Sequence, residues 1–189
     1  MFGISMSGYW ALRALSSPDT LLRAAATFEA VSGDFETIFE SAQPSFKNNY
    51  MYMAGYTDEA DFDRGLKARL PLGDLVRHIT HPVLLGIGEF DELTPGRERA
   101  GNLRTDHRPK EMRVYENEFH PLGGVAAEVF RLAAEWLQRA INGEPAETGR
   151  DVRHYVQATG ARPTAPPAPP GGTPLYKSIR DACSPARTG

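Results

Sequence analysis

The sequence lacks the features that mark several protein classes. It has one cysteine, Cys183, so an intramolecular disulfide is excluded, and no nucleophile motif surrounds that thiol. No run of about 18 apolar residues is present to span a bilayer, and the start has neither the basic residues nor the apolar core of a secretory signal. With Met1 as the true start, we expect a cytoplasmic protein with no membrane association.

An excess of charge of one sign is also lacking. The 21 lysine and arginine residues and the 24 aspartate and glutamate residues are interspersed and leave a formal net charge of -3. A protein that binds nucleic acid usually carries a basic patch or stripe. We therefore expect no nucleic-acid partner.

Helix and strand periodicity is weak in residues 144–189, which hold eight of the chain's 15 prolines. Such a composition favours extended or disordered chain. We predict a partial domain over residues 1–143 and a Pro/Gly-rich flexible tail over 144–189. The segment "PTAPPAPPGG" is compatible with a polyproline ligand, but a solvated linker is the simpler interpretation because flanking specificity residues are missing.

Strand and helix patterns alternate through residues 1–143, which predicts an α/β fold with a parallel sheet. Strands are expected at residues 1–3 and within "LRAAATFEAVSG", "HPVLLGIGEFD" and "EMRVYENEFH". Helices are expected at about 6–17, after Thr94 and Pro95, and over "VAAEVFRLAAEWLQRAINGE". The last helix has one apolar face, made of Val125, Val129, Leu132, Ala133, Trp136, Leu137 and Ala140. An irregular, mostly helical stretch at about 34–79 is typical of a lid.

The turn "GISMSG" at residues 3–8 matches a nucleophile elbow, in which a serine on a tight strand-to-helix turn has small residues two positions before and after it. With Ser5 as the nucleophile, Gly3 and Ser7 take those two positions. With Ser7 instead, Tyr9 would take a cramped position, so Ser5 is favoured. A glycine/serine turn that merely caps a helix is the alternative interpretation.

An acid and a histidine follow the next two expected strands of the sheet. Asp91 lies in the loop "GEFDELTP" and His120 in the loop "EFHPLGG", where open α/β sheets present functional groups at strand carboxyl ends. Glu89, Glu92 and Asp106 compete with Asp91 for the role of the acid. No HExxH or paired-histidine spacing supports a metal, and "GIGEFD" lacks the third glycine of a dinucleotide fingerprint.

The order Ser5, Asp91, His120 is that of an α/β-hydrolase. Together with "GISMSGYWALRA" and the lid-like stretch ending "ARLPLGDLVRHITHPVLLGIGEFDELTP", it makes residues 1 to about 143 resemble the C-terminal half of an α/β-hydrolase. In detail the segment is similar to the branch of 2,6-dihydropseudooxynicotine hydrolase-like and prolyl-oligopeptidase-like esterases.

The resemblance implies a serine hydrolase that cleaves an ester, an amide or an activated carbon–carbon bond of a small molecule, with no cofactor and no metal. It implies Ser5 as the nucleophile, His120 as general base and then acid, and Asp91 as the residue that orients the imidazole. The backbone amide of Met6 would donate to the oxyanion.

Aromatic and soft apolar side chains cluster in the lid-like stretch. Phe46, Tyr50, Tyr52 and Tyr56 suit a pocket for an aromatic or acyl substrate, and they equally suit packing of the lid itself. We expect substrate choice to be decided here.

The resemblance also implies a sheet of about eight strands, with the serine after the fifth, whereas only two residues precede this elbow. The loop that supplies the family's second oxyanion donor would be missing, and loss of one donor costs on the order of a hundred- to a thousandfold in rate. We therefore expect an N-terminally truncated chain that is unstable or inactive alone. A non-catalytic remnant that acts as a binding module is the alternative function.

Overall fold

The computed structural model describes residues 1–31, 35–93, 110–144 and 152–158, which fold as two compact units. The described residues of Met1–Val31 and Asp74–Gly189 form the first, here called the sheet unit. The second, Ser32–Gly73, is here called the helical unit.

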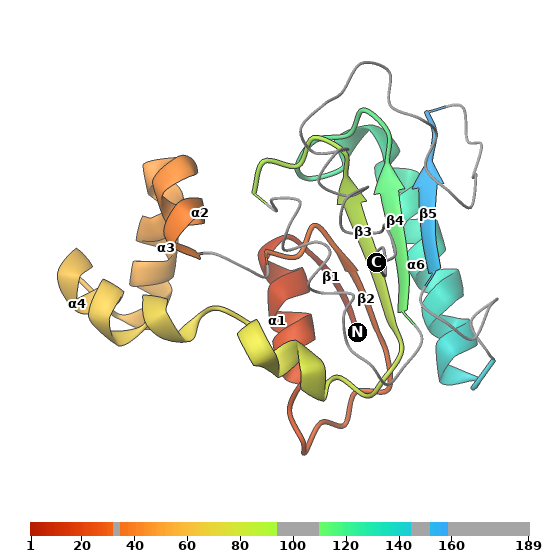
Figure 1. Ribbon diagram of the computed structural model, residues 1–189, viewed down its shortest axis with the longest axis horizontal. Coiled ribbons are helices and arrows are strands. Elements are labelled where there is room, and N and C mark those ends of the chain that lie inside the picture. Colours follow the sequence, from red (N-terminus) through yellow and green to blue (C-terminus); the bar gives the residue numbers. More distant parts are fainter. Residues whose placement is uncertain (32–34, 94–109, 145–151, 159–189) are drawn as a thin grey trace, which may run out of the picture. The chain divides into compact units, whose positions relative to one another are not determined.

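The sheet unit is built on five parallel strands that lie side by side in chain order, as Figure 1 shows. The strands are β1 (Phe2–Ile4), β2 (Ala25–Phe28), β3 (Val83–Gly88), β4 (Lys110–Tyr115) and β5 (Val152–Val156). Because all five run the same way, their carboxyl ends meet at one edge of the sheet. All six residues of β3 are buried, as expected for a strand covered on both faces. The predicted α/β class with a parallel sheet is confirmed.

The fifth strand corrects the prediction of a flexible tail from residue 144 onward. Residues 152–156 pair in parallel register with β4, and Tyr155 and Val156 are buried. Five residues of "VRHYV" suffice for a strand, but the proline-rich composition that surrounds them in the sequence hid this short pattern. Residues 159–189 lie outside the described part of the chain.

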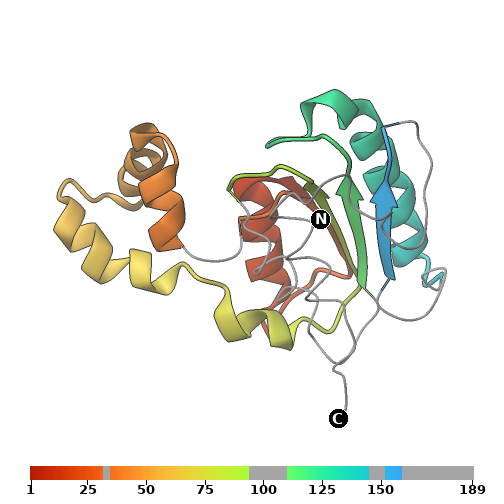
Figure 2. The same cartoon turned by 45° about the horizontal axis from the view of Figure 1, so that its top comes forward.

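Helices α1 (Met6–Leu15) and α6 (Ala126–Ile141) lie on opposite sides of this sheet, as Figure 2 shows. The predicted apolar face of α6 is confirmed, because Val129, Leu132, Ala133 and Trp136 are buried and its other members pack against the same core. That core also contains Phe28 of β2 and Leu84 of β3. Two short 3-10 helices, η2 (Gly73–His78) and η3 (Gly123–Val125), precede β3 and α6. The helix predicted after Thr94 lies outside the described residues.

The helical unit has the helical character predicted for the lid-like stretch. It contains α2 (Phe35–Ser41), α3 (Pro44–Ala54), α4 (Glu59–Gly65) and the 3-10 helix η1 (Lys67–Arg69). Its interior is aromatic, with ring-to-ring contacts among Phe35, Phe39, Tyr50 and Phe62.

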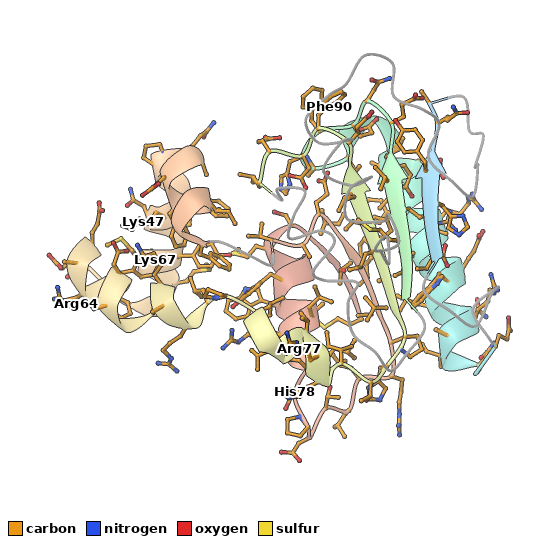
Figure 3. The ribbon with its side chains drawn as sticks, viewed as in Figure 1. Lys47, Arg64, Lys67, Arg77, His78 and Phe90 are labelled. Atoms are coloured by element: carbon orange, nitrogen blue, oxygen red, sulfur yellow. The ribbon has the colours of Figure 1, made fainter. Side chains whose placement is uncertain are left out.

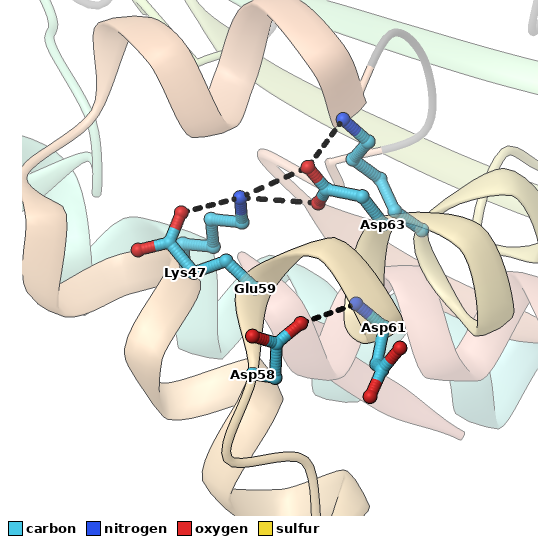
Figure 4. Close-up of polar contacts among 6 residues, drawn as sticks. Lys47, Asp58, Glu59, Asp61 and Asp63 are labelled. Carbon is cyan, nitrogen blue, oxygen red and sulfur yellow. Dashed lines mark hydrogen bonds and ion pairs between the residues drawn. The ribbon is translucent and has the colours of Figure 1, made fainter.

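A small network of charged side chains joins α3 to α4 in the helical unit, as Figure 4 shows. Lys47 of α3 lies 3.0 Å from carboxylate oxygens of both Glu59 and Asp63 of α4. Asp58 accepts the backbone N–H of Asp61 at 2.9 Å, a side-chain cap that fixes where α4 begins. Lys47 thus links α3 to α4.

Across the ranges the structure describes, none of the helices combines the length and the hydropathy needed to cross a membrane.

Candidate active site

Ser5 lies on the turn between β1 and α1 with φ 55° and ψ -123°. Residues other than glycine seldom adopt a positive φ, so the surrounding structure must hold this conformation. The Ser5 N–H donates to the carbonyl of Phe28 at the end of β2, at 2.8 Å. The turn therefore places Ser5 at the carboxyl end of the strands. Met6 begins α1, where the first N–H groups have no acceptor within the helix.

The two small residues of this turn have identifiable tasks. A Cβ atom on Gly3 would lie 2.5 Å from the backbone carbon and oxygen of Ser7, so glycine is required there. The Ser7 hydroxyl accepts the N–H of Ile4 at 2.8 Å and donates to the Ile4 carbonyl at 2.7 Å. Ser7 thus fastens the turn, while the side chain of Ser5 is directed elsewhere.

His120 follows β4 and reaches Ser5 across the end of the sheet. Its Nε2 atom lies 2.8 Å from Ser5 Oγ. Its loop is tied to the loop after β3, because the N–H of Phe90 donates to the carbonyl of Glu118 at 2.9 Å and the N–H of Asn117 donates to the Glu89 carboxylate at 3.1 Å. These bonds join the loop that carries His120 to the loop that carries Asp91.

Asp91 is buried on the other side of the imidazole, 1% exposed. Its Oδ1 atom lies 3.4 Å from His120 Nδ1 and also accepts the N–H of Leu93 at 2.9 Å. The competing acids are placed differently: Glu89 serves the loop contact above, and Glu92 is exposed. Asp106, the remaining competitor, lies outside the described residues. Of the acids weighed from the sequence, Asp91 is the one beside His120.

Sequence reasoning missed a second acid at this site, Glu29. This residue directly follows β2, has a φ of 50° and is fully buried. Its Oε2 atom lies 3.4 Å from His120 Nδ1, the same distance as Asp91, and its Oε1 atom accepts the N–H of Gly88 at 3.2 Å. An acid immediately after an expected strand was the signal that singled out Asp91, and the same signal applies to Glu29.

The charges of the site act on one another strongly. Burial lowers the pKa of His120, but the hydrogen bond and charge of Asp91 and the charge of Glu29 outweigh it and raise the pKa above its usual range. Burial, reinforced by the charge of Asp91, raises the pKa of Glu29 to about 8. One imidazole therefore faces two buried carboxyl groups, and the pKa of one of them, Glu29, is raised.

The same three side chains bring one ring nitrogen and two carboxylate oxygens within 4.8 Å of one another. No metal was predicted from the sequence. In this arrangement Nδ1 faces the carboxylates and Nε2 faces a hydroxyl, which suits an imidazole that keeps one proton on Nδ1 and exchanges another at Nε2.

The aromatic residues predicted to bind substrate lie in the helical unit. Tyr50 is buried among Phe35, Phe39 and Phe46, and Tyr56 packs against Phe62. Tyr52 is 87% exposed. Packing within the unit thus accounts for Phe46, Tyr50 and Tyr56, and their role toward a substrate stays a prediction.

An open hollow of about 650 Å³ lies at the other end of the sheet unit, lined among others by Ser16, Arg77, His78 and His81. Figure 3 shows Arg77 and His78 at that end, and Phe90, the residue before Asp91 in the sequence, at the opposite end. The lining residues of the hollow include no acid that would orient a histidine. The Ser5 site is therefore the stronger candidate.

The solved structures that resemble this chain include AbyA5 and a 2,6-dihydroxy-pseudo-oxynicotine hydrolase. AbyA5 matches 75% of this chain with a TM-score of 0.62 at 17% identity, and the hydrolase matches 79% with a TM-score of 0.59 at 18% identity. Both have the α/β-hydrolase fold. The described sheet shares that fold. The matched regions amount to 43% and 42% of those two chains, so this chain corresponds to less than half of each. No family model and no curated protein matches the sequence.

Proposed function

We propose that this chain carries the reaction centre of a serine hydrolase that forms an acyl-enzyme on Ser5. The observation that carries the proposal is the 2.8 Å contact between Ser5 Oγ and His120 Nε2 at a strained strand-to-helix turn. The fold shared with a named hydrolase agrees with it. Its substrate is an ester, an amide or an activated carbon–carbon bond of a small molecule.

The proton movements follow from the two faces of His120. With the proton on Nδ1, facing Asp91, the Ser5 hydroxyl donates to Nε2. As Oγ attacks the substrate's carbonyl carbon, its proton moves to Nε2, and the raised pKa of His120 favours holding it. The same proton then goes to the leaving group, and a water molecule releases the acyl group by the reverse sequence. The amide of Met6 is the proposed donor to the oxyanion.

A fluorophosphonate label tests this proposal without knowledge of the substrate, because it reacts with an activated serine. With the Met6 amide as the one proposed oxyanion donor, we expect slow labelling of the activated serine even where turnover of a substrate is lost. The label is followed over hours by mass spectrometry of the intact chain and of its N-terminal peptide. Ser5→Ala should abolish the label. Ser17→Ala, which removes an exposed hydroxyl after α1, is the matched control and should leave the rate unchanged.

Labelling that persists in Ser5→Ala, or a folded chain that stays unlabelled, would refute the proposal. Far-UV circular dichroism of each variant shows that the fold is retained before the rates are compared.

A further inference from the structure

Glu29 is a buried acid for which the proposed reaction has no assigned task. Its side chain is fully enclosed between β2, the end of β3 and the His120 loop. A Cβ atom on Gly88 would lie 3.0 Å from Glu29 Oε1, so the glycine leaves the space in which its own N–H reaches that oxygen. The other oxygen, Oε2, has no hydrogen-bond partner within the described residues.

The two acids converge on a single nitrogen. Oε2 of Glu29 and Oδ1 of Asp91 both lie 3.4 Å from Nδ1 of His120. Nδ1 has one hydrogen to donate, so two ionised carboxylates would compete for it. The titratable groups acting on Glu29 are Asp91 and Glu92 from the loop after β3 and His120 from the loop after β4. Of these three, His120 is the one that can carry a positive charge. Two buried negative charges against one imidazole are poorly compensated.

We propose that Glu29 is a positioning residue that carries a proton at neutral pH and, together with Asp91, forms a carboxyl pair with one negative charge beside His120. The proposal rests on the proposed function of the Ser5 site. Each carboxyl group accepts one backbone N–H, Asp91 that of Leu93 at 2.9 Å and Glu29 that of Gly88 at 3.2 Å. We assign the proton to Glu29 because its bond is the longer of the two and so stabilises an ionised carboxylate less.

This assignment predicts that replacing each carboxyl side chain by the corresponding amide has different effects on the labelling rate at the two positions. A glutamine resembles a protonated glutamate in shape and in its lack of charge, so Glu29→Gln preserves what Glu29 contributes at neutral pH. An asparagine in place of ionised Asp91 removes the negative charge and favours the wrong tautomer of His120. Ionisation of Glu29 at higher pH then adds a second negative charge next to the imidazole.

Carbon-13 NMR of the full chain with labelled glutamate side-chain carboxyls and histidine rings tests the proposal. The resonance that is missing from Glu29→Gln identifies Glu29. We expect its titration midpoint near pH 8, as the raised pKa indicates, with a matching step in the His120 ring that disappears in Glu29→Gln. Glu135→Gln, an exposed change on α6, should leave both signals intact. A titration midpoint of Glu29 below pH 6 would overturn the proposal. Glu29→Gln is needed only to assign the resonance, and the midpoint itself is measured on the wild-type chain.

Fluorophosphonate labelling at pH 7 supplies the second readout. We expect Asp91→Asn to slow labelling by at least about a hundredfold and Glu29→Gln to slow it far less, because glutamine keeps the shape and the neutrality of a protonated glutamate. Equal, large losses in both variants would mean that Glu29 acts as an ionised acid and would overturn the proposal. If no protein is labelled at all, the serine hydrolase itself is refuted, and the NMR titration of Glu29 remains readable as a separate result.

Discussion

His120 Nε2 and Ser5 Oγ lie 2.8 Å apart, although 115 positions separate the two residues in the chain. We predict that His120→Gln slows labelling of Ser5 by at least about a thousandfold, because the hydroxyl loses its proton acceptor. His78→Gln, an exposed histidine at the other end of the sheet unit, is the matched control. Similar labelling in His120→Gln and wild type would contradict the assigned base.

Gly3 is the position where the turn tolerates no side chain. We predict that Gly3→Ala lowers the free energy of unfolding of the sheet unit by about 2–3 kcal/mol and slows labelling, because the new methyl group meets the Ser7 backbone at 2.5 Å. The urea midpoint followed by fluorescence of Trp10 and Trp136, both in the sheet unit, measures the change. Gly123→Ala adds a methyl group in open space and should be nearly neutral, so equal effects at both glycines would count against the steric explanation.

The raised pKa of Glu29 predicts that the folded chain loses stability as the pH rises. In the unfolded chain this carboxyl ionises near pH 4.5, while in the folded chain it keeps its proton until about pH 8. Between these values the folded state binds more protons, so the free energy of unfolding falls with pH, by up to about 5 kcal/mol in total. Urea midpoints at pH 5 and pH 8.5 should therefore differ more in wild type than in Glu29→Gln. Parallel pH dependences in the two proteins would contradict this prediction.

Lys47 should stabilise the helical unit in a way that salt weakens. We predict that Lys47→Met, which removes the contacts with Glu59 and Asp63 but keeps an apolar stem, lowers the protection of α3 and α4 amides by about 1 kcal/mol in native-state hydrogen exchange. The effect should shrink in 1 M salt, since the charges are at the surface. Arg64→Met removes an exposed pair with Asp61 on α4 alone and should change less. A larger effect of Arg64→Met would contradict the network's role.

The sequence was sufficient for the strands that are long and apolar and for three of the side chains at the site. Ser5, Asp91 and His120 each follow a recognisable strand, so their meeting at one edge is a consequence of parallel pairing. β5 was missed because its five residues stand in proline-rich surroundings and depend on β4 for their hydrogen bonds. Glu29 was missed because its burial depends on β3 and on the His120 loop, which lie far from it in sequence.

The bonds between the loop after β3 and the loop after β4 have a mechanical consequence. Because Phe90 is hydrogen-bonded to Glu118 and Asn117 to Glu89, we expect the loops that carry Asp91 and His120 to move together. A shift in either strand then displaces Asp91 and His120 together and leaves their mutual spacing intact. Ser5 lies on a separate turn that is hydrogen-bonded to β2, so such a shift would change the distance between His120 Nε2 and Ser5 Oγ.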